Sequence, residues 1–270
     1  MMISKMIIPA AGIGSRFLPI TKTIPKEMLP LSHKPAIEYI VQEAIDASIS
    51  NISIVLSPDK KIITDYFSYN AQLDAILKQD GKSDCMKELY SLIAQTSFSY
   101  YIQNQPKGLA DALLQAQSFI DREEYFAVAL PDDIIVGDQP EIGQLASIAQ
   151  QHKVMVIAVQ QVPQDKISSY GVIAPRRQVA DNCFEIDRLI EKPSIEQAPS
   201  DLAIVGRYVF HHDLFTYIPQ TLAPTGEILL PDTINLMIQQ GYRVYAVQVK
   251  GQRFDTGTPV GWLQAVNTLS

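Results

Sequence analysis

MIIPAAGIGSRFLPITKTIPKEMLP, residues Met6–Pro30, begins as an apolar run and continues into a loop of small residues, glycines and cations. This order predicts a buried β-strand that ends at a loop whose backbone can approach a ligand closely. Arg16, Lys22 and Lys26 lie in the loop, and the prolines between them disfavour a helix. Exposed backbone N–H groups combined with cations suit a phosphorylated ligand. We therefore interpret the loop as a polyphosphate site at a strand end, where open α/β sheets bind their ligands.

Two familiar phosphate-binding motifs do not fit this loop. The dinucleotide-binding fingerprint needs a third glycine three residues after Gly14, and Phe17 stands there instead. A P-loop would need Gly-Lys-Ser or Gly-Lys-Thr, which the stretch lacks. An ordinary turn with solvated basic side chains is the simpler alternative. The coincidence of strand end, glycines and cations in one loop favours the phosphate site.

The chain after the loop alternates between helical and extended patterns. Apolar residues recur at helical spacing after Pro35, and residues 52–56 form an apolar run typical of a buried strand. Strand, loop, helix and strand within about 50 residues predict a βαβ unit with parallel strands and a right-handed crossover. Residues 59–96 are predicted to be largely helical and to pack on a sheet face. Further strands are predicted at residues 98–102, 125–130, 154–160, 170–173, 184–190, 203–210 and 242–249, and further helices after Gly108, between Gly226 and Gly241, and at the end of the chain.

The composition is that of an ordinary globular enzyme, with 270 residues, 47% hydrophobic and 19% charged. A net charge of −7 argues against general affinity for nucleic acid or anionic membranes. Cys85 and Cys183 stand alone, without the spacing of a zinc site or a disulfide framework. No apolar run approaches the roughly 18 residues needed to span a bilayer. We expect a reduced, cytoplasmic protein without a membrane partner.

A pair of carboxylates follows the predicted strand at residues 125–130, in the sequence Pro131-Asp132-Asp133. Oxygen ligands at the carboxyl end of a buried strand suit a hard cation such as Mg²⁺, which also prefers phosphate oxygens. The same sequence is also typical of a simple turn or helix start. From these residues alone, both interpretations stay open.

GIGSRFLPITKTIPKEMLP resembles the signature of the nucleotidyltransferases that join a sugar 1-phosphate to a nucleoside triphosphate. IPKEMLPL is similar in particular to the bacterial UTP–glucose-1-phosphate uridylyltransferases. The resemblance covers nearly the whole chain, with the motifs in the family's order. It implies a Rossmann-like, GT-A-like α/β fold, in which helices flank a mixed, mostly parallel central sheet. We expect one nucleotidyltransferase domain over residues 1–270, with a nucleotide-binding half of about 1–130 and a sugar-phosphate-binding half of about 131–270.

The resemblance assigns roles to the residues of the N-terminal loop. In the family the glycine-rich loop wraps the nucleotide, an arginine stabilises the departing pyrophosphate, and the lysine of PKEMLP contacts phosphate. Carried over by position, these residues are Ala10, Ala11, Gly12 and Gly14 in the loop, then Arg16, Lys26, and Glu27 beside the nucleoside.

A glutamine that reads the uracil edge precedes the next helix in the family. Gln105 is the residue that we match to it, and Gly108 is expected to offer its backbone to the base. An amide suits this role because it both donates and accepts. GLADA stands here where GLGHA is usual in the family, and the segment after Gln105 is shorter, so base selectivity stays open.

The resemblance also places a metal ion and the sugar phosphate. The metal-binding position of LPDDI is Asp132, with Mg²⁺ as the cofactor, and the second metal ligand of the family matches Asp255 in Arg253-Phe254-Asp255-Thr256-Gly257. Glu191 of the EKP sequence is expected to bind sugar hydroxyls and Lys192 to bind the phosphate. The remaining residues assigned to the sugar side are Gly171 and Gly206, while Glu227 resembles a family residue near the sugar.

The reaction that the resemblance implies is UTP plus glucose 1-phosphate giving UDP-glucose and pyrophosphate. A phosphate monoester has a second pKa of about 6, so the attacking oxygen is already anionic near neutral pH and needs no base. Arg16, Lys26 and Lys192 would then act by placement and charge neutralisation. The alternatives are another nucleotidyltransferase such as a thymidylyl enzyme, a non-catalytic nucleotide-sugar sensor, or an NAD-dependent oxidoreductase, which Phe17 disfavours. The choice between glucose and galactose stays open. Members of the family tend to form dimers or tetramers, so the resemblance predicts a homodimer or homotetramer.

Overall fold

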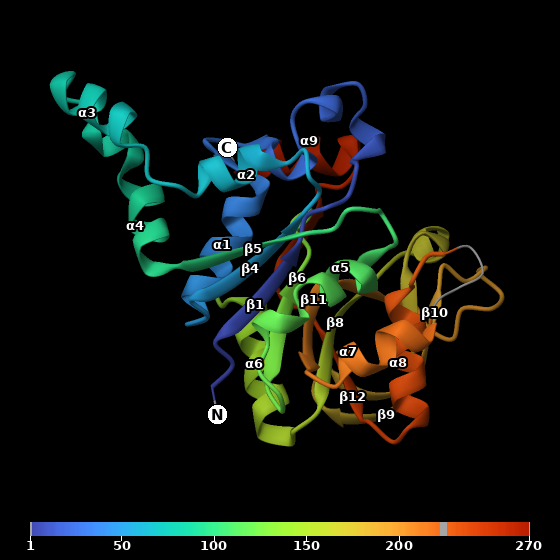
Figure 1. Ribbon diagram of the computed structural model, residues 1–270. Helices are drawn as coiled ribbons and strands as arrows, with labels where there is room; N and C mark the ends of the chain where they lie inside the picture. The colour runs from blue at the N-terminus through green and yellow to red at the C-terminus, as the bar shows by residue number, and fades with distance from the viewer. Residues whose placement is uncertain (1, 222–225, 270) are drawn as a thin grey trace.

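The computed structural model describes residues 2–221 and 226–269, and within these ranges its centre is a nine-stranded sheet (Figure 1). The strand order is β5-β4-β1-β6-β11-β8-β12-β10-β9. Two short antiparallel ribbons accompany the sheet. The sheet strands are β1 Lys5–Pro9, β4 Asn51–Leu56, β5 Ser97–Ile102, β6 Tyr125–Ala129, β8 Met155–Gln161, β9 Gly171–Ala180, β10 Cys183–Glu191, β11 Leu202–His211 and β12 Val244–Gln248. The ribbons pair β2 Pro30–Leu31 with β3 Lys34–Pro35, and β7 Asp133–Val136 with β13 Gln252–Asp255.

Helices cover both faces of the sheet (Figure 1). In chain order they are α1 Ala36–Asp46, α2 Lys61–Tyr66, α3 Ala71–Gln79, α4 Lys87–Gln95, α5 Leu109–Gln115, α6 Glu141–His152, α7 Leu214–Tyr217, α8 Leu230–Gln239 and α9 Pro259–Leu269. None of the helices described in residues 2–221 and 226–269 combines the length and the hydropathy required to cross a membrane.

The N-terminal half of the sheet is parallel. Strand β1 lies between β4 and β6, and Met6 aligns with Ile52 on one side and with Ala127 on the other. Helix α1 connects β1 to β4, which confirms the predicted βαβ unit. All three strands therefore end at the same edge of the sheet, the edge at which the Met6–Pro30 loop begins.

The other half of the sheet is mixed. Strand β11 runs antiparallel to both of its neighbours, β6 and β8, and β12 then runs parallel to β8. Strands β10 and β9 complete the sheet as an antiparallel hairpin. The expected mixed α/β sheet is confirmed. It is not mostly parallel, however, because β9, β10 and β11 form antiparallel pairs with their neighbours. A single sheet spans both predicted halves of the chain.

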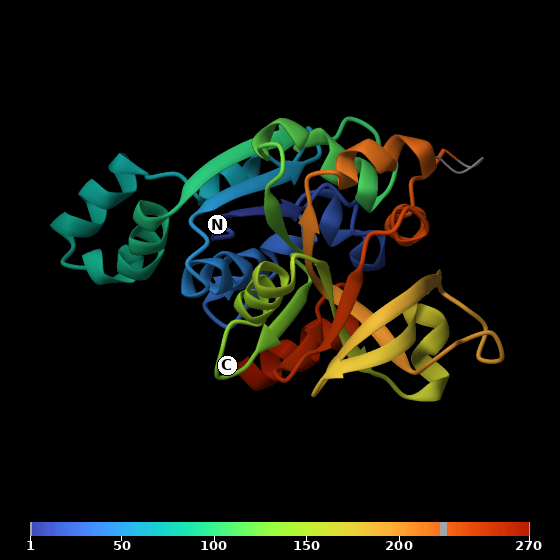
Figure 2. The same cartoon turned by 90° about the horizontal axis from the view of Figure 1, so that it is seen from below.

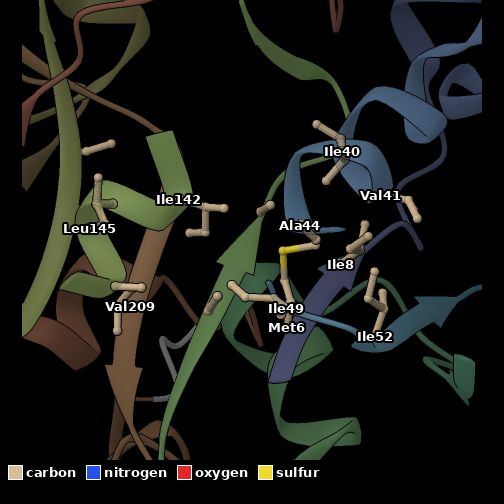
Figure 3. Close-up of a cluster of buried hydrophobic side chains, with 14 of the residues drawn as sticks. Met6, Ile8, Ile40, Val41, Ala44, Ile49, Ile52, Ile142, Leu145 and Val209 are labelled. Carbon is tan, nitrogen blue, oxygen red and sulfur yellow. The ribbon is translucent and has the colours of Figure 1, made fainter. Parts of the chain in front are cut away.

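Two layers of apolar side chains pack against the two faces of the sheet. Because successive strand residues point to opposite faces, Met6 and Ile8 belong to one layer and Ile7 to the other. Figure 3 shows the first layer, where Met6 and Ile8 lie beside Ala44 of α1, and Ile142 of α6 lies across from them. Fully burying one such side chain stabilises the fold by about 1.5–3 kcal/mol. These layers make the sheet a rigid support for the loops at its edge.

Helix α3 projects away from the body of the protein (Figures 1 and 2), whereas Leu92 of α4 packs in the core. None of the nine described residues of α3 is buried, and α4 buries only Leu92. The prediction that residues 59–96 pack on a sheet face is therefore wrong for α3, although the helices themselves are present. Its apolar residues Leu73 and Ile76 are exposed, because α3 extends past the edge strand β5.

Candidate active site

The ribbon of β7 and β13 brings the two predicted metal ligands together. It pairs Asp133 with Asp255 across 122 residues of sequence, with Asp132 immediately before β7. The N–H and Oγ1 of Thr256 donate to the carbonyl oxygen of Asp132 at 2.8 and 2.9 Å. A Cβ atom added to Gly257 would lie 2.7 Å from Asp132 Oδ2 and 3.1 Å from Asp255 Oδ1. The two carboxylates therefore flank one point, and a side chain at Gly257 would intrude between them.

Asp133 is occupied by protein partners. Its carboxylate forms an ion pair with Arg253 and accepts the N–H of Gly206 at 2.7 Å. Burial, followed by the negative charge of Asp133, raises the pKa of Asp255 above its ordinary value. A cation at this point would relieve that repulsion. Of the three aspartates, Asp132 and Asp255 are thus the two that could hold a metal, with Asp133 beside them.

Two predicted cations reach the same place. Lys26 Nζ lies 2.5 Å from Asp132 Oδ2, and Arg16 Nη1 donates to the carbonyl oxygen of Gly257 at 3.4 Å. Burial alone would raise the pKa of Asp132, but the ammonium of Lys26 lowers it below the ordinary range. Asp132 is therefore ionised at neutral pH. Arg16, Lys192 and both aspartates line one cavity of about 720 Å³, here called the catalytic cavity.

The described residues form no cluster of three or more metal-ligating side chains. A two-carboxylate site still fits Mg²⁺, which commonly takes one or two protein carboxylates and completes its shell with water and substrate phosphates. The donor set is all oxygen and anionic, as that ion requires.

A second cavity, of about 310 Å³, borders the loop and is here called the base cavity after the role expected of the glutamine beside it. Ala11, Lys22 and Gln103 are among its lining residues. Gln105, by contrast, is exposed and does not line it. The assignment of Gln105 is therefore corrected to Gln103, because the chain leaves the sheet after β5 with Gln103 still at the strand end, whereas Gln105 already faces solvent.

Gln103 is held in a fixed orientation. Its Nε2 donates to the carbonyl oxygen of Gly108 at 3.1 Å and to Asp111 Oδ2 at 2.7 Å. Gly108 has φ 96°, and an added Cβ would lie 2.7 Å from the carbonyl oxygen of Ile228. Only glycine fits at this crossing of α5 and the segment before α8. The helix beginning predicted after Gly108 is confirmed.

Two residues of the loop differ from their predicted roles. Ala10 is fully buried and its N–H donates to Val55, so it supports the loop from below rather than facing a ligand. Glu27 is 1% exposed and its carboxylate pairs with Lys60. The placement of Glu27 beside the nucleoside is corrected, because a carboxylate enclosed beneath the loop cannot reach a ligand in the cavity. Ala11 lines the base cavity, and Gly14 turns the loop with φ 73°.

A third cavity, of about 240 Å³, is here called the sugar cavity after the role expected of residues that line it. Glu191 and Glu227 line it, together with Gly171, at which an added Cβ would come within 3.0 Å of Glu191 Oε2. Ile204 and Tyr208 border both this sugar cavity and the catalytic cavity, so the two adjoin. Glu191 and Gly171, both assigned to the sugar side from the sequence, thus line the same cavity.

Lys192 follows Glu191 and turns toward the catalytic cavity with a left-handed φ of 44°. Non-glycine residues in this conformation cost free energy and cluster at functional sites. Its Nζ lies 3.5 Å from Glu191 Oε1, and 62% of its side chain is exposed. Gly206 borders the same cavity, but an added Cβ would point at Leu130 at 2.7 Å, so close strand packing also requires this glycine.

The nucleotidyl transferase family matches residues 5–270 of this chain. A UTP–glucose-1-phosphate uridylyltransferase from Mycoplasma pneumoniae is 40% identical over 266 residues, which are 97% of this chain and 91% of the relative. The chain belongs to the UTP–glucose-1-phosphate uridylyltransferases of the nucleotidyl transferase family.

Solved structures extend the likeness of this uridylyltransferase to the fold. A UDP-glucose pyrophosphorylase in complex with UDP-glucose shares 37% identity and a TM-score of 0.90, covering 99% of this chain and 98% of that one. A UTP-bound UGPase from Acinetobacter baumannii shares 36% identity and a TM-score of 0.92, covering 99% and 93%. The expected nucleotidyltransferase fold is confirmed.

Reading the sequence missed three residues of the uridylyltransferase site. Gln103 directly follows the strand predicted at residues 98–102, and this position at a strand end is the signal that distinguishes it from Gln105. Arg253 precedes the Asp-x-Gly motif, but its partner Asp133 lies 120 residues away in the chain. Lys60 stands two residues after Pro58, in the segment that follows a predicted strand. This pattern predicts an exposed turn, yet the lysine is only 4% exposed.

Proposed function

We propose that this uridylyltransferase transfers a uridylyl group from UTP to glucose 1-phosphate, giving UDP-glucose and pyrophosphate. The observation that carries the proposal is that Arg16, Asp132 and Asp255 line one cavity that adjoins the sugar cavity. Lys26 forms an ion pair with Asp132 at this cavity. The structural relative bound to UDP-glucose and the one bound to UTP support the choice of substrates.

The chain's residues assist this reaction by placement and charge. The phosphate oxygen of glucose 1-phosphate attacks the α-phosphorus of UTP in line, its bond forms as the bond to pyrophosphate breaks, and no proton need move. Lys192 at the border of the sugar side would hold the attacking phosphate. Lys26 and Arg16 would neutralise the triphosphate and the leaving pyrophosphate.

Mg²⁺ is the proposed cofactor, held by Asp132 and Asp255. When bound, it would supply a positive charge to the phosphate oxygens between the two carboxylates. The chain sets the positions of the two carboxylates. Gly257 leaves the space between them open, and Thr256 holds Asp132 in place by donating to its carbonyl oxygen. The homo-oligomeric state stays a prediction from the resemblance.

The decisive experiment measures pyrophosphate release with UTP, dTTP, CTP and ATP, each combined with glucose, galactose and mannose 1-phosphates and Mg²⁺. We expect UTP with glucose 1-phosphate to give the highest kcat/KM. Preference for dTTP would identify a thymidylyltransferase instead. Binding of UDP-glucose without turnover in either direction would indicate a nucleotide-sugar sensor.

Lys192→Ala is expected to raise the KM for glucose 1-phosphate about 10- to 100-fold, because a charge-assisted contact to phosphate contributes about 1.5–3 kcal/mol. The Kd for UTP, measured by titration calorimetry, should stay within about threefold, since Lys192 borders the sugar side of the cavity. Arg188→Ala is the matched control, because Arg188 is an exposed cation of β10, the strand that precedes Lys192, and its ion pair is with neighbouring Asp187. Equal KM values for Lys192→Ala and Arg188→Ala would remove Lys192 from the site.

Gln103→Ala is expected to raise the KM for UTP about tenfold, the effect of losing one hydrogen bond of about 1.5 kcal/mol. Both Nε2 hydrogens of Gln103 have protein acceptors, so Oε1 is the atom left to accept from the base. An acceptor there suits the N3–H of uracil and not the bare N3 of cytosine. Gln105→Ala is the control and should leave the KM unchanged. The corrected assignment fails if Gln105→Ala has the larger effect.

A further inference from the structure

We infer that Lys60 is a positioning residue that directs backbone N–H groups of the Ala10–Gly14 loop toward the nucleotide triphosphate. The inference rests on the proposed function, because it names how that same site is prepared for its substrate. Lys60 lies between β4 and α2, outside the Met6–Pro30 stretch, and is 4% exposed.

The ammonium of Lys60 is saturated with acceptors. Its Nζ donates to the carbonyl oxygens of Ala10 and Gly12, both at 2.6 Å, and to the carboxylate of Glu27, at 2.9 and 3.1 Å. An ammonium has three hydrogens, and here three groups accept them. One side chain thus ties together the strand end, the tip of the loop and the PKEMLP segment.

The carbonyl positions fix the direction of the neighbouring amides. In a planar trans peptide the N–H points opposite to the C=O of the same unit. Because the carbonyls of Ala10 and Gly12 point at Lys60, the N–H groups of Ala11 and Ile13 point to the opposite side of the loop. Within residues 2–221 and 226–269, neither of these N–H groups donates a hydrogen bond. Two aligned donors on one side of a loop form a concavity for anions.

Charge explains why this arrangement needs a cation. Ala10 O, Gly12 O and the carboxylate of Glu27 are all acceptors converging on one buried point. Without Lys60 they would repel one another, and a loop carbonyl would be driven outward. The peptide would then turn, and an oxygen would replace an N–H on the side that receives phosphate. This effect differs from a loss of stability, because it acts on triphosphate affinity in a folded protein.

The test compares UTP affinity with stability in variants of the full chain. Lys60→Met keeps the aliphatic stem and removes the charge, and Lys60→Met/Glu27→Gln removes both buried charges. We expect the double variant to recover most of the Tm that the single variant loses, because no buried charge is left unpaired. Its Kd for UTP, measured by calorimetry, should stay about 10- to 100-fold above wild type. The KM for glucose 1-phosphate should change less than the Kd for UTP.

A double variant with wild-type Tm and a wild-type Kd for UTP would overturn the inference and leave Lys60 a purely structural residue. Lys60→Arg covers the case in which both methionine variants unfold. Its guanidinium keeps the charge beside Glu27 but cannot place one nitrogen between the carbonyl oxygens of Ala10 and Gly12. A raised Kd for UTP in a folded Lys60→Arg protein therefore supports the inference, and an unchanged Kd overturns it. If the wild-type protein prefers dTTP to UTP, the proposed function is overturned but the inference about Lys60 is not. The Kd values of wild type and the Lys60 variants are then compared for dTTP instead of UTP.

Discussion

Asp132→Asn is expected to lower kcat at least about 10²–10³-fold, the effect of removing one preorganised charge from a site that stabilises a charged transition state. Asparagine keeps the size of the side chain and can still hydrogen-bond, so the loss comes from the charge. Asp132 flanks the point that Asp255 also faces, and it holds Lys26 at 2.5 Å. The substitution therefore removes a magnesium ligand and leaves Lys26 without its ion-pair partner. The measurement is steady-state pyrophosphate release over a range of Mg²⁺ concentrations.

The result should show a weaker apparent affinity for Mg²⁺ together with a lower kcat that added Mg²⁺ does not restore. Asp138→Asn is the matched control, because Asp138 is an exposed aspartate that follows β7 and lies outside the catalytic cavity. Its kinetics should equal those of wild type. An Asp132→Asn variant with wild-type kcat at saturating Mg²⁺ would exclude Asp132 as an essential metal ligand.

The parallel half of the fold could be predicted from the sequence because its signals are local. An apolar run such as Ile52–Leu56 shows one strand, and helical spacing after Pro35 shows the crossover. Parallel strands end at one edge of a sheet. This rule alone places the loop and Asp132 at the same edge. The meeting of Asp132 and Asp255 came from the resemblance, since nothing local marks Asp255 as a partner.

The remaining features depend on contacts between distant residues, which local patterns do not encode. The β7–β13 ribbon is four residues on each side, too short to give a clear alternating pattern, and its register alone brings Asp255 beside Asp133. Glu27 and Lys60 have charged side chains that usually face solvent, and only their mutual pairing allows both to be buried. Gln103 and Gln105 differ by two positions, and the direction of the chain after β5 decides between them.

Arg207→Met is expected to destabilise the fold by about 3–5 kcal/mol, the cost of leaving a buried partner charge uncompensated. Arg207 is fully buried in β11, and its Nε and Nη2 donate to Glu43 Oε2 of α1 at 3.0 and 2.7 Å. Its Nη1 donates to the carbonyl oxygen of Gly206 at 2.9 Å. At about 2–4 °C per kcal/mol for a chain of this size, thermal unfolding should show Tm lowered by about 6–20 °C.

The matched variant Arg207→Met/Glu43→Gln separates charge from packing. Glu43 Oε1 also accepts the N–H of Ile142 at 3.0 Å, and the glutamine oxygen can keep that bond while the charge is removed. We therefore expect the double variant to recover more than half of the lost Tm. Recovery would show that the cost of the single substitution is the stranded carboxylate. A double variant as unstable as the single one would instead assign the cost to the bonds that Arg207 donates to the backbone beside Gly206. In that case Arg207 would act chiefly by holding β11 against the segment that carries Asp132.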